Sequence, residues 1–137
     1  MKYPKINLCL SALFFASSPF AFCEIDFVRD VKPILEHNCV SCHREDNAKG
    51  KIRLDTKAAA FAGDEVIVPG KPEDSSLYWT TTLPSDDDIA MPPIKNEDKD
   101  YPLTKFEKNI LREWIKEGAE WPDEEKLTSQ KRLPKQV

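Results

Sequence analysis

The chain has 137 residues, of which 40% are hydrophobic, so it is long enough for one small domain with its own core. It carries 20 basic and 24 acidic side chains, a net charge of −4, and this acidic balance argues against nucleic acid as a partner. Eleven prolines favour a loop-rich fold with few long elements.

Residues 1–23 have the pattern of a secretory signal peptide. Two lysines give a positive start, and the apolar run at 8–16 is too short to span a bilayer as a stable anchor. Ala21 and Cys23 supply the small residues that a cleavage site before residue 24 requires. We therefore expect the protein to be periplasmic or otherwise exported, without stable membrane insertion once the signal is removed.

Two alternatives remain for this segment. In the first, the segment stays in place as a helix that tethers the protein to the membrane. In the second, Cys23 is a lipidation site, although Phe22 is larger than the residue that usually precedes a lipidated cysteine. Signal removal leaves 18 basic and 24 acidic residues, a net charge of −6, and leaves Cys39 and Cys42 as the cysteines of the exported domain. An acidic surface suits solubility and a basic partner protein.

An apolar stripe predicts the first helix, over residues 24–38. Asp26 can cap its start. Pro33 should kink the helix or restart it. The apolar side chains recur with a period of 3.6 residues, at Phe27, Val31, Ile34 and Leu35.

The middle of the chain predicts loops and short helices. Residues 44–55 are polar and indicate a loop. Helix-forming composition follows at 57–62, with Thr56 as a plausible cap and Gly63 as a terminator.

A turn-rich PGKP stretch then separates this helix from a short one through residues 77–79, which Asp74 or Ser75 can cap. The acidic patch at 86–88 leads into a loop that Pro92 and Pro93 stiffen.

The strongest helix signal begins at Thr104. Thr104 and Glu107 match a capping box, and Gly118 suits the terminator position. The polar segment 123–137 is predicted to be a disordered tail, which leaves 24–122 as the domain. The apolar stripe of this helix consists of Phe106, Ile110, Leu111, Trp114 and Ile115.

The motif CVSCH, residues 39–43, is typical of covalent haem attachment. Two thiols separated by two residues can each add to one vinyl group of a porphyrin from the same side. The adjacent His43 then offers its imidazole to the iron. We therefore predict a haem c bound through Cys39 and Cys42, with His43 as an iron ligand.

Three alternatives compete with haem. A zinc site would have to use Cys39, Cys42, His43 and His37, four ligands crowded into seven residues, whereas structural zinc normally draws a second pair from farther away. A thioredoxin-like redox pair requires a strand before the motif, and the chain predicts a helix there. A plain disulfide with an incidental histidine also remains possible.

Met91 is the predicted sixth ligand of the iron. It is the one methionine left after signal removal, and it lies 48 residues after His43 in a proline-stiffened loop. Its thioether would raise the reduction potential relative to a second histidine. The alternatives are that Met91 fills a gap in the core, or that His37 takes the position, which would require the chain to wrap around the porphyrin edge.

Several apolar side chains are candidates to pack two helices together and cover one haem edge. Trp79 is a candidate to donate its ring N–H to a haem propionate, although core packing is the simpler interpretation. The helix-packing candidates are Phe27, Ile34, Leu35, Phe106, Leu111 and Trp114.

The chain resembles the planctomycete-type cytochrome c domain, within the wider class I cytochrome c fold. The matching stretches span residues 27–122 and run in order as FVRDVKPIL, CVSCH, KIRLDT, VPGKPEDSSLY, MPP and LREWIKEGAEWP. Arg44 departs from the pattern, because many relatives have glycine after the histidine.

The resemblance implies a small all-α, loop-rich cytochrome c-like fold around one haem, with proximal His43 and distal Met91, and haem attachment after export. The expected function is one-electron transfer between a donor and an acceptor protein. The alternative is a haem enzyme, such as a peroxidase, or a ligand sensor with a displaceable sixth ligand. Family domains are often fused to enzymatic modules, and a catalytic role borrowed from fused relatives is not expected of this chain.

Overall fold

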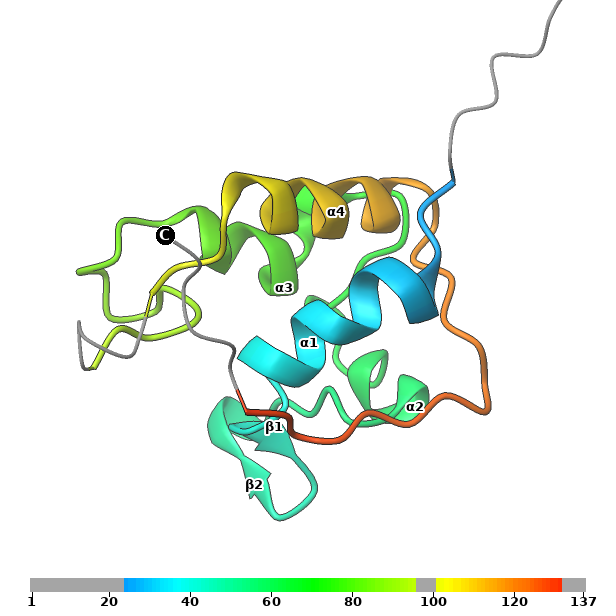
Figure 1. The fold of residues 1–137 in the computed structure, drawn as a ribbon, viewed down its shortest axis with the longest axis horizontal. Coiled ribbons are helices and arrows are strands. Elements are labelled where there is room, and N and C mark those ends of the chain that lie inside the picture. Colours follow the sequence, from blue (N-terminus) through cyan, green and yellow to red (C-terminus); the bar gives the residue numbers. More distant parts are fainter. Residues whose placement is uncertain (1–23, 96–100, 132–137) are drawn as a thin grey trace, which may run out of the picture.

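The computed structural model describes residues 24–95 and 101–131, which form short helices joined by loops and one small sheet (Figure 1). The predicted signal peptide, residues 1–23, lies outside the described residues, and so does Cys23. No helix in the described ranges is long and apolar enough to cross a membrane. The elements in chain order are η1 (Phe27–Val31), α1 (Lys32–Asn38), β1 (His43–Arg44), β2 (Asn47–Ala48), η2 (Lys49–Lys51), α2 (Lys57–Ala60), η3 (Pro72–Asp74), α3 (Ser76–Trp79), η4 (Thr80–Thr82) and α4 (Lys105–Lys116).

The all-α prediction holds in part, because the chain is helix-rich but also contains a hairpin. Strands β1 and β2 pair antiparallel, with His43 opposite Ala48 and Arg44 opposite Asn47. This segment was predicted to be a loop. Strands of two residues carry no alternating pattern, so the sequence offers no signal for them.

The first helical segment begins and restarts where the sequence predicts. The side chain of Asp26 accepts a hydrogen bond from the amide of Arg29 at 2.6 Å and so caps the π-helical turn η1. Helix α1 then begins at Lys32, with Pro33 in its first turn. Proline is tolerated there because its missing N–H would have no partner within the helix.

Helix α4 confirms the predicted capping box. The hydroxyl of Thr104 accepts from the amide of Glu107 at 3.1 Å, and the Glu107 carboxylate accepts from the amide of Thr104 at 2.8 Å. Gly118 follows the helix with a φ of 114°, which an L-residue rarely adopts. The predicted stripe is buried from Ile110 onward, but Phe106 is 74% exposed. Phe106 lies in the first turn of α4 with its side chain at the surface, so its prediction as a packing residue is wrong.

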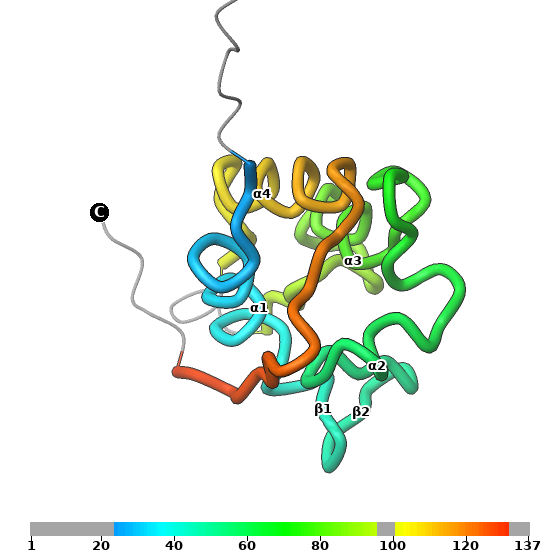
Figure 2. Tube along the Cα trace, turned by 90° about the vertical axis from the view of Figure 1, so that its right-hand side faces the viewer, coloured from blue at the N-terminus to red at the C-terminus, as the bar shows by residue number. Residues whose placement is uncertain are grey.

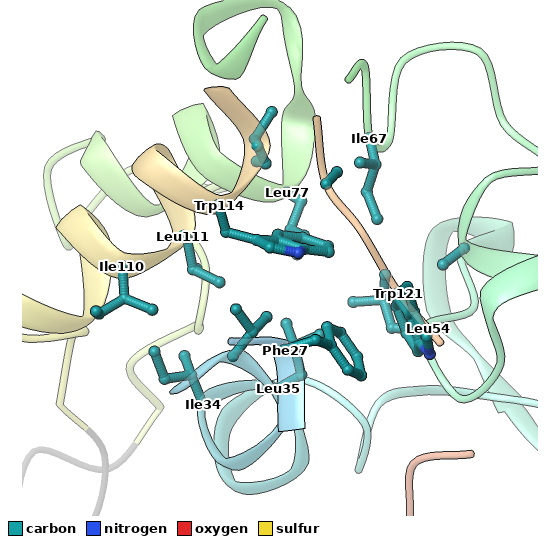
Figure 3. Close-up of a cluster of buried hydrophobic side chains, with 14 of the residues drawn as sticks. Phe27, Ile34, Leu35, Leu54, Ile67, Leu77, Ile110, Leu111, Trp114 and Trp121 are labelled. Carbon is teal, nitrogen blue, oxygen red and sulfur yellow. The ribbon is translucent and has the colours of Figure 1, made fainter. Parts of the chain in front are cut away.

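The core lies between α4 and the N-terminal helices η1 and α1 (Figure 3). The ring of Phe27 stacks on Trp121 at 4.4 Å between centroids and contacts Trp114 at 5.7 Å. Both indole N–H groups have backbone partners, since Trp114 donates to the carbonyl of Glu120 and Trp121 to that of Glu125. The aromatic rings therefore bury their apolar area without leaving a polar atom unsatisfied.

Helix α2 is shorter than predicted. Its cap is confirmed, because the hydroxyl of Thr56 accepts from the amide of Ala59 at 3.3 Å. The helix ends at Ala60, with Phe61 as its C-terminal cap, and not at Gly63.

The end of the chain is not disordered throughout. Residues 123–131, which we name the C-terminal strap, begin with a turn and then run past α2 to the end of α1 (Figure 1 and Figure 2). Leu127 is 4% exposed, and its amide donates to the carbonyl of Asp55 at 2.9 Å. The amide of Gln130 donates to the carbonyl of Glu36 at 3.0 Å. The predicted disorder is therefore wrong for the strap, while residues 132–137 lie outside the described residues.

Candidate functional site

The CVSCH motif forms a tight turn at the end of α1. The amides of Cys39 and Val40 both donate to the carbonyl of Leu35, at 2.9 and 3.0 Å. The amides of Cys42 and His43 then both donate to the carbonyl of Cys39, at 3.1 Å each. Val40 is fully buried and anchors the turn in the core, while the two cysteines are half-buried. The turn therefore presents both thiols from one compact piece of backbone.

His43 is fixed through both its backbone and its ring. Its carbonyl accepts a hydrogen bond from the amide of Leu54 at 2.8 Å. Its ring atom Nδ1 lies 3.3 Å from the carbonyl oxygen of Ile52, and because a carbonyl can only accept, Nδ1–H is the donor. Nε2 is then the ring nitrogen with a lone pair to offer a metal ion.

A left-handed turn brings Ile52 to the histidine. Gly50 has a φ of 63° and Lys51 a φ of 61°, two successive residues in a region that L-residues seldom occupy. Strained backbone of this kind persists where the surrounding structure holds it in place, and it is enriched at functional sites.

A cavity of about 310 Å³ lies against the CVSCH turn. Cys39, Cys42 and His43 line it, and so does Met91. The structure thus brings the four predicted site residues to one space. Apolar side chains form much of the remaining wall, among them Leu54, Val66, Leu77 and Leu103.

Met91 lines this cavity from the loop that follows η4. Its amide donates to the carbonyl of Thr80 at 3.1 Å, which ties the loop to the end of α3. Ala90 beside it is 5% exposed, and Met91 is half-buried. The predicted loop over residues 86–93 is confirmed, since no helix or strand is assigned to these residues.

Other residues that the sequence singled out lie elsewhere. His37 is not part of the cavity lining, and its Nδ1 lies 2.8 Å from the carbonyl oxygen of Lys131 in the strap. Trp79 does not line the cavity either. Arg44 pairs with Asp46 at 2.6 Å and lies beside a different hollow. The helix-packing candidates are also absent from the lining, because they hold η1, α1 and α4 together, with the exception of the exposed Phe106.

The geometry also bears on the alternatives to haem. Among residues 24–95 and 101–131, no group of three or more His, Cys, Asp and Glu side chains is arranged to hold a metal ion. Cys39 and Cys42 are not bridged to each other. Neither finding lends support to a zinc site or to a structural disulfide.

The polar part of the cavity wall was not predicted. Ser76, Thr80 and Thr81 line it from α3 and η4, Lys49 lines it from η2, and Asp88 and Lys95 line it from the loop after η4. Lys49, the group at 76–81, and the residues at 88 and 95 come from separate parts of the sequence, and no common motif joins them. The stretch VPGKPEDSSLY carries part of the resemblance, and it was the sequence signal that could have indicated the α3 region as part of the site.

Comparison with known families gives one match. The family model described as Planctomycete cytochrome C matches residues 39–95, from the first cysteine of CVSCH to just beyond MPP. The match covers both sides of the cavity and confirms the resemblance inferred from the sequence; residues 27–38 and 101–122 lie outside it. No curated protein and no solved structure matches the chain.

Proposed function

From the match of residues 39–95 to the planctomycete cytochrome C family model, we propose that the protein is an exported mono-haem c-type cytochrome that carries single electrons. The observation that carries the proposal is the cavity, which CVSCH lines together with Met91. In this assignment Cys39 and Cys42 would hold haem c through two thioether bonds, and His43 and Met91 would be the residues that ligate its iron.

The residues at the cavity fit such a group. One turn supplies two thiols with the spacing of the two vinyl groups, and its next residue supplies a ring nitrogen. Leu54, Val66, Leu77 and Leu103 offer apolar surface to a large flat macrocycle. Burial of this macrocycle compensates for the small core that a domain of this size can form alone.

His43 is oriented before any ligand binds. Donation from Nδ1 to the Ile52 carbonyl fixes the tautomer and the ring plane. The bond from the Leu54 amide to the His43 carbonyl holds the backbone beneath the ring. The histidine therefore loses little freedom when it acts as a ligand.

Met91 contributes a neutral, soft thioether. Such a ligand favours ferrous over ferric iron and raises the reduction potential relative to a second histidine. Pro92 and Pro93 restrict the backbone beside it, which lowers the entropy lost when the loop is held near the cavity. When bound, the haem supplies a one-electron ferric–ferrous couple.

The carrier role follows from the two axial residues. If the chain itself supplies both, no substrate needs to bind at the metal, and electrons pass to and from partner proteins by brief docking. We propose a donor and an acceptor protein as partners, and export through the signal at residues 1–23.

The test is to express the full chain in cells that mature c-type cytochromes. We expect the mature polypeptide to carry one added haem mass, and its alkaline pyridine spectrum under reducing conditions to report two thioether bonds. The ferric protein should show the far-red methionine–iron charge-transfer band, and Met91→Ala should abolish it while keeping the haem mass. A chain without added tetrapyrrole would sink the proposal. A haem protein without the band would favour the enzyme or sensor with an open sixth position.

A further inference from the structure

Met91 depends on a short neighbouring helix for its position. Its amide donates to the carbonyl of Thr80, the first residue of η4, which directly follows α3. Helix α3 has four residues, Ser76–Trp79, and so short a helix is not stable by itself in water. Any contact that fixes α3 therefore also fixes the Thr80 carbonyl, to which the Met91 amide is bonded.

The start of α3 is held by the preceding loop. The amide of Ser76 donates to the carbonyl of Glu65 at 2.8 Å, and that of Leu77 to the carbonyl of Val66 at 3.1 Å. These bonds satisfy two of the amides that a helix start leaves without a partner. The loop thus takes the place of a side-chain cap, since the hydroxyl of Ser75 does not cap α3.

Ser75 is engaged in holding that loop together. Its side chain is fully buried, one of two buried polar residues in the part of the chain that the structure describes. Its hydroxyl accepts from the amide of Val68 at 2.9 Å and donates to the carbonyl of Lys71 at 2.8 Å. This hydroxyl therefore holds two points of the preceding loop, Val68 and Lys71, against the residue that precedes α3.

The loop is in turn anchored to α4. The amide of Gly70 donates to the carbonyl of Ile115 at 2.7 Å, in the last turn of that helix. Arg112 of α4 pairs with Glu73 at 2.8 Å. Leu77 adds an apolar anchor, because it belongs to the same core cluster as Trp114 (Figure 3). A continuous chain of contacts runs from α4 through Ser75 and α3 to Met91.

We propose that Ser75 is a positioning residue for the axial methionine. The inference rests on the proposed function, because it concerns Met91 as an iron ligand. Loss of the hydroxyl leaves the Val68 amide without this partner and removes one of the two hydrogen bonds that the Lys71 carbonyl accepts, the other coming from the amide of Asp74 at 3.2 Å. The loop then relaxes, α3 loses its fixed start, and the Thr80 carbonyl no longer holds Met91 at one distance from the iron.

The experiment measures how firmly Met91 is held in the ferric holoprotein. Imidazole is the probe, because it binds ferric iron only where the methionine gives way. We expect Ser75→Ala to bind imidazole about tenfold more tightly than the wild type, with a weaker far-red band before titration. The matched control is Thr56→Ala, which also removes a hydrogen-bonded hydroxyl, at the α2 cap away from this chain of contacts. It should lose stability and keep the wild-type imidazole affinity.

Gly70→Ala provides a second variant if Ser75→Ala does not fold. Gly70 has a φ of 80°, and an added Cβ would meet no atom within 4 Å, so the change strains the loop without a clash. We expect tighter imidazole binding here too, by a smaller factor. Unchanged imidazole affinity in the folded variants would overturn the role of Ser75. A wild type without haem would instead overturn the proposed function.

Discussion

The two sides of the cavity are held in place in different ways. On the histidine side, the CVSCH loop (residues 39–54) is fixed by a succession of backbone hydrogen bonds and by the buried side chains of Val40 and Leu54. On the methionine side, residues 84–89 are all exposed, and the amide of Met91 is bonded to the Thr80 carbonyl. One side is built into the core, while the other is a surface loop attached to a short helix.

This difference indicates which of the two proposed ligands the fold holds more firmly. The position of His43 follows from residues within a dozen positions of it, so it is set by local chain geometry. The position of Met91 depends on α3, on the loop before α3 and on α4. When the protein is destabilised, we expect the methionine side to open first.

The sharpest test of the comparison removes the proposed haem-binding residues of each side in turn. A chain with both Cys39→Ala and Cys42→Ala should carry no covalent haem, because no thiol remains for either vinyl group. Met91→Ala should retain the full haem mass. Intact-mass spectrometry of the exported proteins distinguishes the two results. Covalent haem on the double variant would contradict the assignment of the thiols.

The free energy of unfolding should distinguish the histidine side of the cavity from the methionine side by the next largest effect. Leu54 is 2% exposed beneath His43, and Leu54→Ala should cost about 2–5 kcal/mol of unfolding free energy through lost burial and the cavity left behind. Ile89 is 53% exposed in the methionine loop, and Ile89→Ala should change stability by no more than about 0.5 kcal/mol. Denaturant unfolding of the holoproteins measures both values, and equal losses would remove the contrast.

The left-handed turn beneath His43 offers a paired test of backbone strain. Lys51→Gly relieves an L-residue at a φ of 61° and should raise stability by about 1 kcal/mol. Gly50→Ala places a side chain at a φ of 63° and should lower it by a similar amount. The added Cβ would meet its nearest atom, in Ile52, at 3.9 Å, so packing does not explain that loss. Changes of the same sign in thermal unfolding would contradict this assignment.

The smallest effect concerns the ion pair between Arg53 and Asp55, at the end of the CVSCH loop. A hydrogen bond from Arg53, at 2.9 Å, lowers the pKa of Asp55 below its ordinary value. The stability this adds is complete above the ordinary aspartate pKa of about 3.9 and is lost as the pH falls through the lower folded value. Asp55→Asn should therefore lower stability slightly at neutral pH and flatten its decline in acid. The exposed Asp86→Asn is the control, and an unchanged acid profile in Asp55→Asn would contradict the prediction.

The sequence predicts best those features that neighbouring residues determine. The caps at Asp26, Thr56 and Thr104 are local hydrogen bonds, and all three form as predicted. The CVSCH motif is equally local. Phe106 shows the limit of periodicity, which identifies the face of a helix but not how far along the helix a neighbour covers it.

Features made by distant backbone groups left no sequence signal. The strap looks like a disordered tail because its side chains are polar, yet backbone bonds to Glu36 and Asp55 hold it. The hydrogen bond between Met91 and Thr80 is equally invisible, since any two residues supply the same amide and carbonyl. The motif therefore identifies the cavity's ligand candidates, while the means of holding one of them emerges from the fold.

The C-terminal strap joins the chain on both sides of the CVSCH loop, since Gln130 is bonded to Glu36 before it and Leu127 to Asp55 after it. A segment bonded to both flanks makes their opening a single cooperative event. Native-state hydrogen exchange should accordingly find the amides of Leu54, Leu127 and Gln130 sharing one opening free energy. The chain before the CVSCH loop, the chain after it and the strap itself should therefore unfold together.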